Sequence, residues 1–346
     1  MTSSSSTLAL VESPVQLLHV LEWRHRHQNA DVRVAVLAPR ASIDRNQLSA
    51  VKAIAEKSGV QVTWLDPRVA EGAPLRAWLT LRKWTKDAER ILIGDPFSGL
   101  IQSILPTNRG AKVVVGDDGT STIDFADLLN SREPLLRWAA RPGRVARVLR
   151  RPLAGGATRF FLSRPAENLQ LFTVMPITAP PNASIKHHSY EWTRQHFGPP
   201  KSEGNLTVVG SSLVETGIML KPAYLKAVEA AVQRAGGRGG YYLAHRRETP
   251  EKLAEIAAKT SLTIVQAQKP LEIELRRTSV ARHVVCFPST PAYTLPLVLQ
   301  DTGATFEVLT IEDSWIRPMA SAHAVAFLAK MGAQLRERDR ANPATD

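Results

Sequence analysis

The sequence predicts an α/β protein with two Rossmann-like domains that face each other across a deep cleft, followed by a C-terminal helix. Short apolar stretches alternate with amphipathic ones in the first half of the chain, and the alternation starts again after proline-rich stretches at 176–184 and 198–205. This alternation is typical of parallel sheets covered by helices on both faces. We therefore predict domains at 1–180 and 181–346, with ligand sites in the cleft between them.

The first domain is expected to contain six strands. Within 44–59, Leu48, Val51 and Ala55 recur on one helical face and Gly59 follows as a C-cap, which predicts a helix that packs on the sheet. The expected strands are 7–12, 32–38, 60–65, 90–95, 111–116 and 169–175, and the expected helices are 14–27, 44–59, 74–88 and 97–105. Residues 126–165 break this rhythm with patches of helix, and 176–184 is interpreted as a linker.

The second domain repeats the pattern. The expected strands are 206–210, 240–245, 262–266, 283–287 and 304–311, and the expected helices are 222–236, 249–260, 269–278, 288–300 and 322–338. The last of these helices is the terminal helix, and no internal repeat of solenoid length is present. The second half is therefore predicted to be a separate α/β domain.

The composition fits a globular intracellular protein. The chain has 346 residues, of which 44% are hydrophobic, enough for two domains with sizeable cores. The single cysteine, Cys286, lies in an apolar stretch, which indicates a buried thiol and a reducing compartment. The N-terminus lacks the basic start of a signal peptide, and no window approaches about 18 uninterrupted apolar residues. We therefore expect a cytoplasmic location.

The charge is strongly positive and unevenly distributed. The formal net charge is +12, which indicates an anionic partner. Between Arg132 and Arg164 there are nine arginines and one acid, Glu133. This segment is interpreted either as an exposed basic surface or as a surface that docks on anionic lipid at the inner membrane face, or on a charged acceptor. Zinc-ligand spacing, an aromatic RNA-binding signature and a helix-turn-helix are all missing, so we expect no nucleic-acid partner.

Unusual polar residues follow several of the predicted strands. They are Glu12, Asp95 and 117–119 in the first half, and 210–212, 245–248 and 289–290 in the second. In open parallel sheets, ligands bind beyond the carboxyl ends of the strands. The shared position of these residues indicates ligand sites more strongly than any one of them does.

The adjacent acids Asp117 and Asp118, followed by Gly119, allow two interpretations. In the first, they form an Asx turn that only satisfies backbone N–H groups. In the second, one carboxylate acts as a general base at the mouth of the cleft, and Gly119 permits a tight bend and close approach of a ligand. Adjacent side chains on a turn point in different directions, so one acid can catalyse while the other anchors the loop.

Three groups in the second half are candidates for binding a phosphate. His245 is followed by two arginines and the start of a helix, a combination that suits an anion. Ser289 and Thr290 precede a helix, where a phosphate site and an ordinary N-cap are equally good interpretations. Gly210 and Ser211 begin a loop that is either a cap or a phosphate-approach loop, although it lacks the lysine of a P-loop.

The histidine pairs do not predict a metal site. His25 and His27 lie two residues apart, and His187 and His188 are adjacent. Neither pair has an acid or cysteine beside it at a metal-ligand spacing. Both pairs are therefore predicted to be surface histidines.

Several short segments resemble the bacterial sialyltransferases of the GT-B type, especially glycosyltransferase family 52 and the related polysialyltransferases. The segments are 9–22, with its Ser-Pro-x-Gln turn, and 116–123, 209–229, 241–249 and 286–295. The chain departs from the family pattern at three places. It has Ser211-Ser212 where Gln-Pro is usual, His245-Arg246 in place of His-Pro, and Ser289-Thr290 in place of paired serines.

The resemblance implies a GT-B fold and an inverting enzyme that needs no metal or other cofactor. Such an enzyme transfers sialic acid or a related nonulosonic acid from its CMP-activated form to a hydroxyl of a glycan, which is lipid-linked or anionic in some cases. By position, Asp118 would be the general base, and His245 would contact the donor phosphate and stabilise the departing CMP. The other implied site residues are Gly210, Ser211, Glu272, Ser289 and Thr290 around the nucleotide, and Pro14, Gln16, Asp117 and Gly119 on the acceptor side of the cleft.

Two other functions remain open at this point. The first is a GT-B enzyme of another class, such as a CDP-polyol phosphotransferase or a sugar-nucleotide epimerase. The second is a non-enzymatic protein that binds polyanions, which the net charge and the arginine-rich segment favour.

Overall fold

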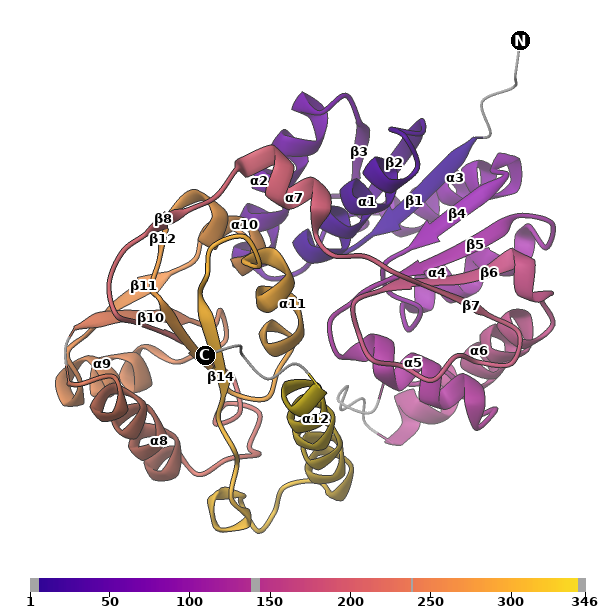
Figure 1. The fold of residues 1–346 in the computed structure, drawn as a ribbon. Helices are drawn as coiled ribbons and strands as arrows, with labels where there is room; N and C mark the ends of the chain where they lie inside the picture. Colours follow the sequence, from indigo (N-terminus) through magenta and orange to yellow (C-terminus); the bar gives the residue numbers. More distant parts are fainter. Residues whose placement is uncertain (1–5, 138–143, 238, 342–346) are drawn as a thin grey trace. The chain divides into compact units, whose positions relative to one another are not determined.

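The computed structural model describes residues 6–137, 144–237 and 239–341 (Figure 1). The chain divides into two compact units, Met1–Trp192 and Thr193–Asp346, each built on its own parallel sheet. The predicted α/β class, with two successive Rossmann-like units and a C-terminal helix, is confirmed. The facing arrangement of the units and the cleft between them stay predictions.

The first unit contains a sheet of seven parallel strands in the order β3-β2-β1-β4-β5-β6-β7. The strands are β1 (Thr7–Val11), β2 (Val32–Leu37), β3 (Gln61–Leu65), β4 (Arg90–Ile93), β5 (Lys112–Gly116), β6 (Leu169–Thr173) and β7 (Ser184–His187). The helices are α1 (Pro14–Arg26), α2 (Ser42–Lys57), α3 (Ala73–Asp87), α4 (Gly99–Ile104), α5 (Ser121–Asn130) and α6 (Arg144–Leu162), with short 3₁₀ turns at Leu105–Thr107 and Ala166–Asn168.

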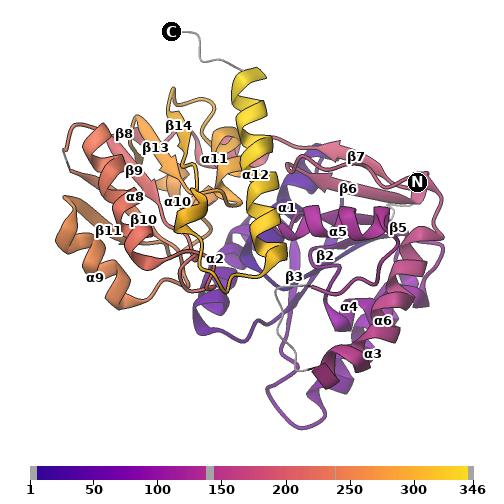
Figure 2. The same ribbon diagram turned by 90° about the horizontal axis from the view of Figure 1, so that it is seen from below.

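The core of the first unit follows from the two-residue period of its strands. Leu8 and Leu10 of β1 lie in one apolar cluster with buried residues of α3, α4, α5 and α6, so these helices cover one face of the sheet (Figure 2). Helices α1 and α2 pack against each other apart from this cluster. The five inner strands are mostly buried, as expected for a parallel sheet covered on both faces, whereas the edge strands β3 and β7 have no fully buried residue.

The division between the units falls after Trp192, beyond the predicted boundary at 180. The reason is β7, which pairs in parallel with β6, with Leu171 opposite Ile185. The proline-rich stretch at 176–184 therefore connects two neighbouring strands of one sheet and is not a linker between domains. Helix α7 (Glu191–Phe197) spans the division. The roles proposed for the two domains stay predictions.

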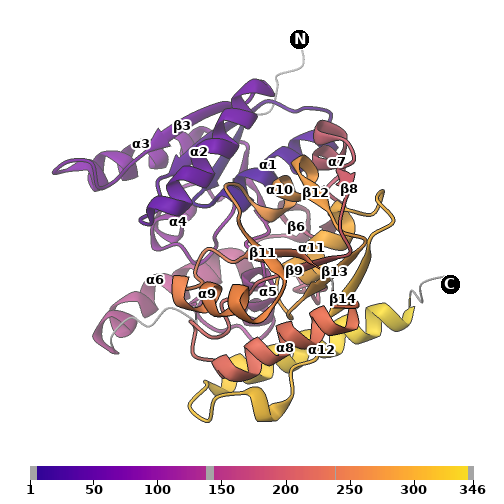
Figure 3. The same cartoon turned by 90° about the vertical axis from the view of Figure 1, so that its left-hand side faces the viewer.

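The second unit contains a sheet of five parallel strands in the order β11-β10-β9-β13-β14 (Figure 3). The strands are β9 (Leu206–Val209), β10 (Gly240–Ala244), β11 (Leu262–Gln266), β13 (His283–Cys286) and β14 (Thr305–Val308), and β8 (Lys201–Ser202) pairs separately with β12 (Ser279–Val280). The helices are α8 (Lys221–Arg234), α9 (Pro250–Lys259), α10 (Leu271–Arg277), α11 (Pro291–Val298) and α12 (Ala322–Ala341), and a 3₁₀ turn lies at Asp313–Trp315. Cys286 is buried in this sheet, as predicted.

Among the described residues, no helix is both long enough and apolar enough to span a membrane. The longest described helix, α12, ends in a run of charged residues. The expected cytoplasmic location stays a prediction.

The first residue of β10 leaves no room for a side chain, which gives a test of the second sheet. A Cβ atom at Gly240 would collide with the backbone carbonyl oxygen of Leu206 in the neighbouring strand β9. We expect Gly240→Ala to lower the free energy of unfolding by about 1–3 kcal/mol, because the two strands must move apart. Denaturant unfolding of the full chain measures this. Gly239→Ala is the matched control, since the adjacent position is exposed and more open. Equal losses in both variants would contradict the tight packing at Gly240.

Candidate functional site

Several of the predicted strand-end residues lie at the switch point of each sheet, where the direction in which successive strands are added reverses. In the first unit, β1 and β4 are neighbours, and the strand order runs outward in opposite directions from this pair. Glu12 follows β1, and Asp95 follows β4. In the second unit the reversal lies between β9 and β13, which are followed by Gly210 and by Pro288-Ser289. Ligands of open α/β sheets bind at these switch points, so each unit has a candidate ligand site.

The site of the first unit is a cluster of three acids around one arginine. Glu12, Asp95 and Asp118 come from the ends of the neighbouring strands β1, β4 and β5. The guanidinium of Arg137 lies 3.2 Å from Asp95 Oδ1 and also pairs with Asp118 Oδ2. One cation therefore stands against three carboxyl groups. Arg137 was noted in the sequence only as one of nine arginines. The sequence does place several acids at the ends of neighbouring strands, and buried acids need a cation beside them. This pattern could have predicted an arginine or lysine at the cluster.

Gln16 fixes the orientation of Asp118. Its Oε1 accepts the backbone N–H of Glu12 at 2.7 Å, and its Nε2 donates to Asp118 Oδ1 at 2.8 Å. Gln16 is held at the start of α1, where Ser13 is the N-cap and Pro14 occupies the first helical turn. The predicted Ser-Pro-x-Gln turn thus brings Gln16 to Asp118, while Pro14 is buried and only starts the helix.

One acid of this cluster, Asp95, retains its proton up to about neutral pH. Burial raises the pKa of the Asp95 carboxyl to about 7. The charges of Asp118 and Glu12 add to this effect, while Arg137 opposes it. Burial also raises the pKa of Glu12, although a hydrogen bond from the Ser98 hydroxyl lowers it in part. Groups that exchange protons near pH 7 are suited to acid–base chemistry, so this cluster is the part of the first unit best placed to move a proton.

Asp117 points away from this cluster and into the fold. Its carboxylate is fully buried and accepts hydrogen bonds from the Thr173 hydroxyl and from the backbone N–H of Val174, the latter at 2.7 Å. Gly119 has a φ of 61°, a left-handed conformation that favours glycine. The turn therefore directs the two adjacent acids differently, with Asp117 inside the core and Asp118 beside Arg137.

The second unit places His245 as a neutral hydrogen-bond donor. The backbone N–H of Arg247 donates to His245 Nδ1 at 3.1 Å, so the proton of the neutral ring is on Nε2. Burial, together with the charges of Arg246, Arg247 and Lys252, lowers the pKa of His245 to about 4. The imidazole is therefore uncharged at neutral pH and presents an Nε2–H group, while Arg246 and Arg247 are exposed beside it.

A buried polar network connects His245 to Gly210 and Ser211. Glu248 accepts the His245 backbone N–H at 2.6 Å and lies 2.9 Å from the Lys252 ammonium, which donates to the Ser211 carbonyl at 3.0 Å. A Cβ atom at position 210 would collide with the Glu248 carboxylate, so the network itself requires this glycine. Lys252, whose side chain is 1% exposed, is not marked as a site residue by any pattern in the sequence.

The remaining predicted nucleotide-site residues lie at the ends of α10 and α11. Ser289 and Thr290 precede α11 at the switch point, and the Ser289 hydroxyl donates to the Phe287 carbonyl at 3.0 Å. Glu272 is buried and accepts from the Thr294 hydroxyl at 2.9 Å, so its carboxylate is engaged inside the unit. The structure thus brings Gly210, Ser211, His245, Ser289 and Thr290 to one edge of the sheet, whereas Glu272 is buried inside the unit.

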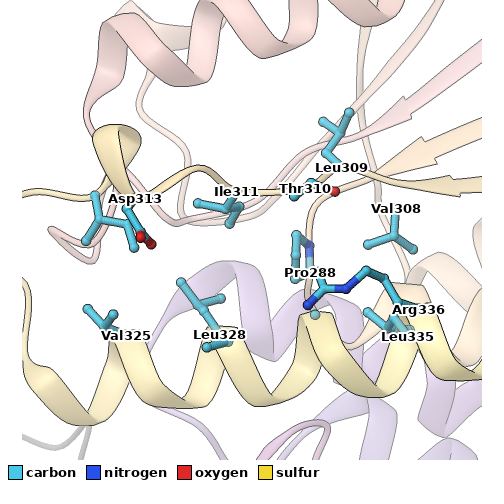
Figure 4. A pocket seen from close by; sticks show the side chains of 13 residues that line it. Pro288, Val308, Leu309, Thr310, Ile311, Asp313, Val325, Leu328, Leu335 and Arg336 are labelled. Atoms are coloured by element: carbon cyan, nitrogen blue, oxygen red, sulfur yellow. The ribbon is translucent and has the colours of Figure 1, made fainter.

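A cavity of about 230 Å³ adjoins this edge in the second unit (Figure 4). On one side it is lined by residues of α12, such as Leu328 and Leu335, and on the other by the segment after β14, including Ile311. Pro288, directly before Ser289, also lines it. The lining is mostly apolar, with Asp313 and Arg336 as charged members, which suits a ligand with a flat apolar part.

The prediction that His188 is a surface residue is wrong. His188 is 6% exposed, its ring stacks on Phe172 with centroids 4.6 Å apart, and its Nε2 lies 3.8 Å from Asp117 Oδ2. No local pattern indicates this burial, because the acid partner, Asp117, belongs to a distant part of the chain. His187 is exposed, as predicted.

The arginine-rich segment has mixed surroundings. Arg137 belongs to the acid cluster, and Arg164 is buried, with its guanidinium 4.5 Å from the centre of the Phe160 ring. Arg151 and Arg159 are exposed on α6. Arg141 lies outside the described residues. At least two of the nine arginines are therefore engaged inside the first unit.

No protein-family model and no curated protein sequence matches the chain. Among solved structures, MurG of Acinetobacter baumannii is 11% identical over 96% of this chain and 84% of its own, with a TM-score of 0.45. The GT-B domain of a sialyltransferase from Photobacterium damselae is 13% identical over 96% and 97%, with a TM-score of 0.45. The heptosyltransferase WaaC of E. coli, solved with ADP-2-deoxy-2-fluoro heptose, is 10% identical over 94% and 99%, with a TM-score of 0.42.

The raised pKa of Asp95 predicts how stability changes with pH. Between its ordinary value of 3.8 and about 7, the folded state binds more protons at this carboxyl than the unfolded state does. This contribution to the free energy of unfolding therefore decreases as pH rises through that window. Relative to wild type, Asp95→Asn should gain about 1 kcal/mol or more between about pH 5 and pH 8, since one pKa unit corresponds to about 1.4 kcal/mol.

Thermal unfolding of both proteins across this pH range measures the effect. The lowered pKa of His245 makes the free energy of unfolding increase as pH rises, which is opposite to the effect of Asp95. The variant is therefore compared with wild type at each pH, so that the contribution of His245 cancels. Asp87→Asn, at an exposed acid at the end of α3, is the matched control. A difference between Asp95→Asn and wild type that stays constant with pH would contradict proton retention by the cluster.

Proposed function

We propose that this protein is an inverting glycosyltransferase of the GT-B type that transfers sialic acid or a related nonulosonic acid from CMP to a glycan hydroxyl. The observation that carries the proposal is the position of Asp118. It lies at a strand end beside the switch point of the first sheet, held by Gln16 and Arg137 and close to the buried carboxyls of Asp95 and Glu12. The choice of CMP and of a nonulosonic acid rests on the short segments that resemble the bacterial sialyltransferases.

Asp118 is the proposed general base. The acceptor oxygen attacks the anomeric carbon of the donor, and the proton of the acceptor hydroxyl moves to the Asp118 carboxylate. The bond between the anomeric carbon and the phosphate oxygen breaks, and its electron pair leaves with CMP. Gln16 and Arg137 hold the Asp118 carboxylate in one orientation, which supports a role that depends on alignment with the acceptor.

The proposed donor site lies in the second unit. As CMP departs, negative charge increases on its phosphate, and hydrogen-bond donors that are already in place stabilise that charge. The Nε2–H of His245 is such a donor, and the exposed Arg246 and Arg247 add positive charge beside it. The hydroxyls of Ser289 and Thr290 lie at the same sheet edge, and in this proposal the Ser289 hydroxyl turns from the Phe287 carbonyl to the phosphate. Gly210 and Ser211 line the same edge, and Pro14, Asp117 and Gly119 support the acceptor side.

The acceptor is proposed to be a glycan that is lipid-linked or anionic. The exposed Arg151 and Arg159 on α6 provide positive charge on the first unit, which also carries the proposed base. In this proposal the protein is cytoplasmic and associates peripherally with the inner membrane face through its 132–164 segment.

The role of Asp118 is tested by replacing it. We expect Asp118→Ala to lower transfer from CMP-sialic acid by about 10²–10⁴-fold, because the acceptor hydroxyl loses its proton acceptor. Binding of CMP should stay unchanged. Product analysis with a labelled donor measures transfer, and calorimetry measures CMP binding. Asp127→Asn, at an exposed acid of α5, is the matched control. Full transfer by Asp118→Ala would overturn the assignment.

The donor class is tested by a thermal shift screen with CMP, CDP, UDP and GDP. We expect CMP to raise the melting temperature most, and His245→Ala to reduce that rise because the phosphate loses a hydrogen-bond donor. Arg282→Ala, at an exposed site before β13, is the control variant. A larger response to UDP or GDP than to CMP would contradict a CMP donor while leaving a GT-B glycosyltransferase in place.

A further inference from the structure

A second polar cluster lies inside the first unit, behind the turn that carries Asp118. It consists of His19 from α1, Asp117 after β5 and His188 after β7. All three residues are buried, and one potential ligand atom from each lies within 4.8 Å of the other two. Two imidazoles and a carboxylate are a common donor set for transition-metal ions.

His19 has the protonation pattern of a metal-bound histidine. Its Nδ1 lies 2.9 Å from the backbone carbonyl oxygen of Asp117, and a carbonyl can only accept a hydrogen bond. The proton of the neutral ring is therefore on Nδ1, and the lone pair is on Nε2. Metal-binding histidines commonly donate their second N–H to a carbonyl or carboxylate in this way. The Tyr190 hydroxyl lies 2.8 Å from His19 Nε2, so a phenol oxygen adjoins the same position.

His188 supplies an independent observation. Its side chain is 3% exposed, and neither of its ring nitrogens has a hydrogen-bond partner among the described residues. A buried polar group without a hydrogen-bond partner destabilises the fold, so such a group calls for a bound ion or water. Its Nε2 lies 3.8 Å from Asp117 Oδ2, which is too long for a hydrogen bond. Two ligands of one tetrahedral ion, each about 2.0–2.1 Å from it, are about 3.4 Å apart, close to this separation.

We propose that His19, Asp117 and His188 bind a divalent transition-metal ion, with Zn²⁺ as the preferred ion. Magnesium and calcium favour all-oxygen sites, whereas a mixed imidazole and carboxylate set suits zinc and cobalt. Asp117 keeps its hydrogen bonds from Thr173 and Val174, because each carboxylate oxygen has two lone pairs. The Tyr190 oxygen, which adjoins His19 Nε2, is the proposed fourth ligand.

The proposed ion is structural, because all of its ligands are buried. It joins α1, the turn after β5 and the segment after β7, and so fixes the turn from which Asp118 projects. The sequence predicted no metal site because the three ligands are far apart along the chain. No step of the proposed transfer passes through the ion. The proposed metal site is therefore independent of the proposed transferase activity.

The test is a metal titration of the full chain. Protein stripped with a chelator is titrated with Zn²⁺ and with Co²⁺, and metal content, melting temperature and the visible absorption of Co²⁺ are recorded. We expect one ion per chain, a higher melting temperature, and the absorption of four-coordinate Co²⁺. His188→Gln should weaken Zn²⁺ binding at least tenfold. His187→Gln, at the adjacent exposed histidine, should leave it unchanged.

Two results would overturn the proposal. One is a folded wild-type chain that binds neither Zn²⁺ nor Co²⁺, and the other is equal Zn²⁺ affinity in His188→Gln and wild type. If His188→Gln does not fold, the Co²⁺ spectrum of the wild-type chain still decides, since surface binding gives the spectrum of six-coordinate Co²⁺. None of these measurements depends on transfer activity, so a failed metal site and a failed transferase assignment are distinguishable.

Discussion

The parallel pairing of the strands is the constraint on which both candidate sites depend. Parallel strands place all of their carboxyl ends at one edge of a sheet, so residues far apart in sequence become neighbours there. In the first unit this brings together Glu12, Asp95 and Asp118, which Arg137 partly neutralises. In the second unit it brings Gly210, His245 and Ser289 to one edge. The sheet determines which side chains become neighbours, and the local turns and caps then set their orientation.

Burial removes charge from both sites, and it acts in opposite directions on acids and bases. It raises the pKa of Asp95 and Glu12, so these carboxyls tend to keep their protons. It lowers the pKa of His245, so this imidazole tends to lose its second proton. The formal net charge of +12 therefore says little about the local charge at either switch point. Both sites therefore contain a buried, uncharged side chain that can donate a proton or a hydrogen bond, Asp95 in the first unit and His245 in the second.

The fold was largely predictable from the sequence, because apolar periodicity and caps are local signals. The alternation of strands and helices, and the strand-end position of Asp118 and His245, follow from such signals. β7 was missed because its residues are only half-buried or exposed at the edge of the sheet and lack an apolar run. Arg137 and His188 were misjudged for a different reason. Their partners, Asp118 and Asp117, are determined by tertiary packing, which no window of the sequence contains.

The amide of Gln16 makes the two oxygens of Asp118 chemically unequal. Because its Oε1 already accepts the N–H of Glu12, the amide cannot flip, and its N–H₂ must face Asp118 Oδ1. Oδ1 therefore accepts from a neutral amide, whereas Oδ2 accepts from the cationic guanidinium of Arg137. Neither donor can become an acceptor, but each oxygen keeps a second lone pair. A proton on Oδ2 would lie against a fixed positive charge, so an incoming hydroxyl group transfers its proton more favourably to Oδ1, the oxygen held by Gln16.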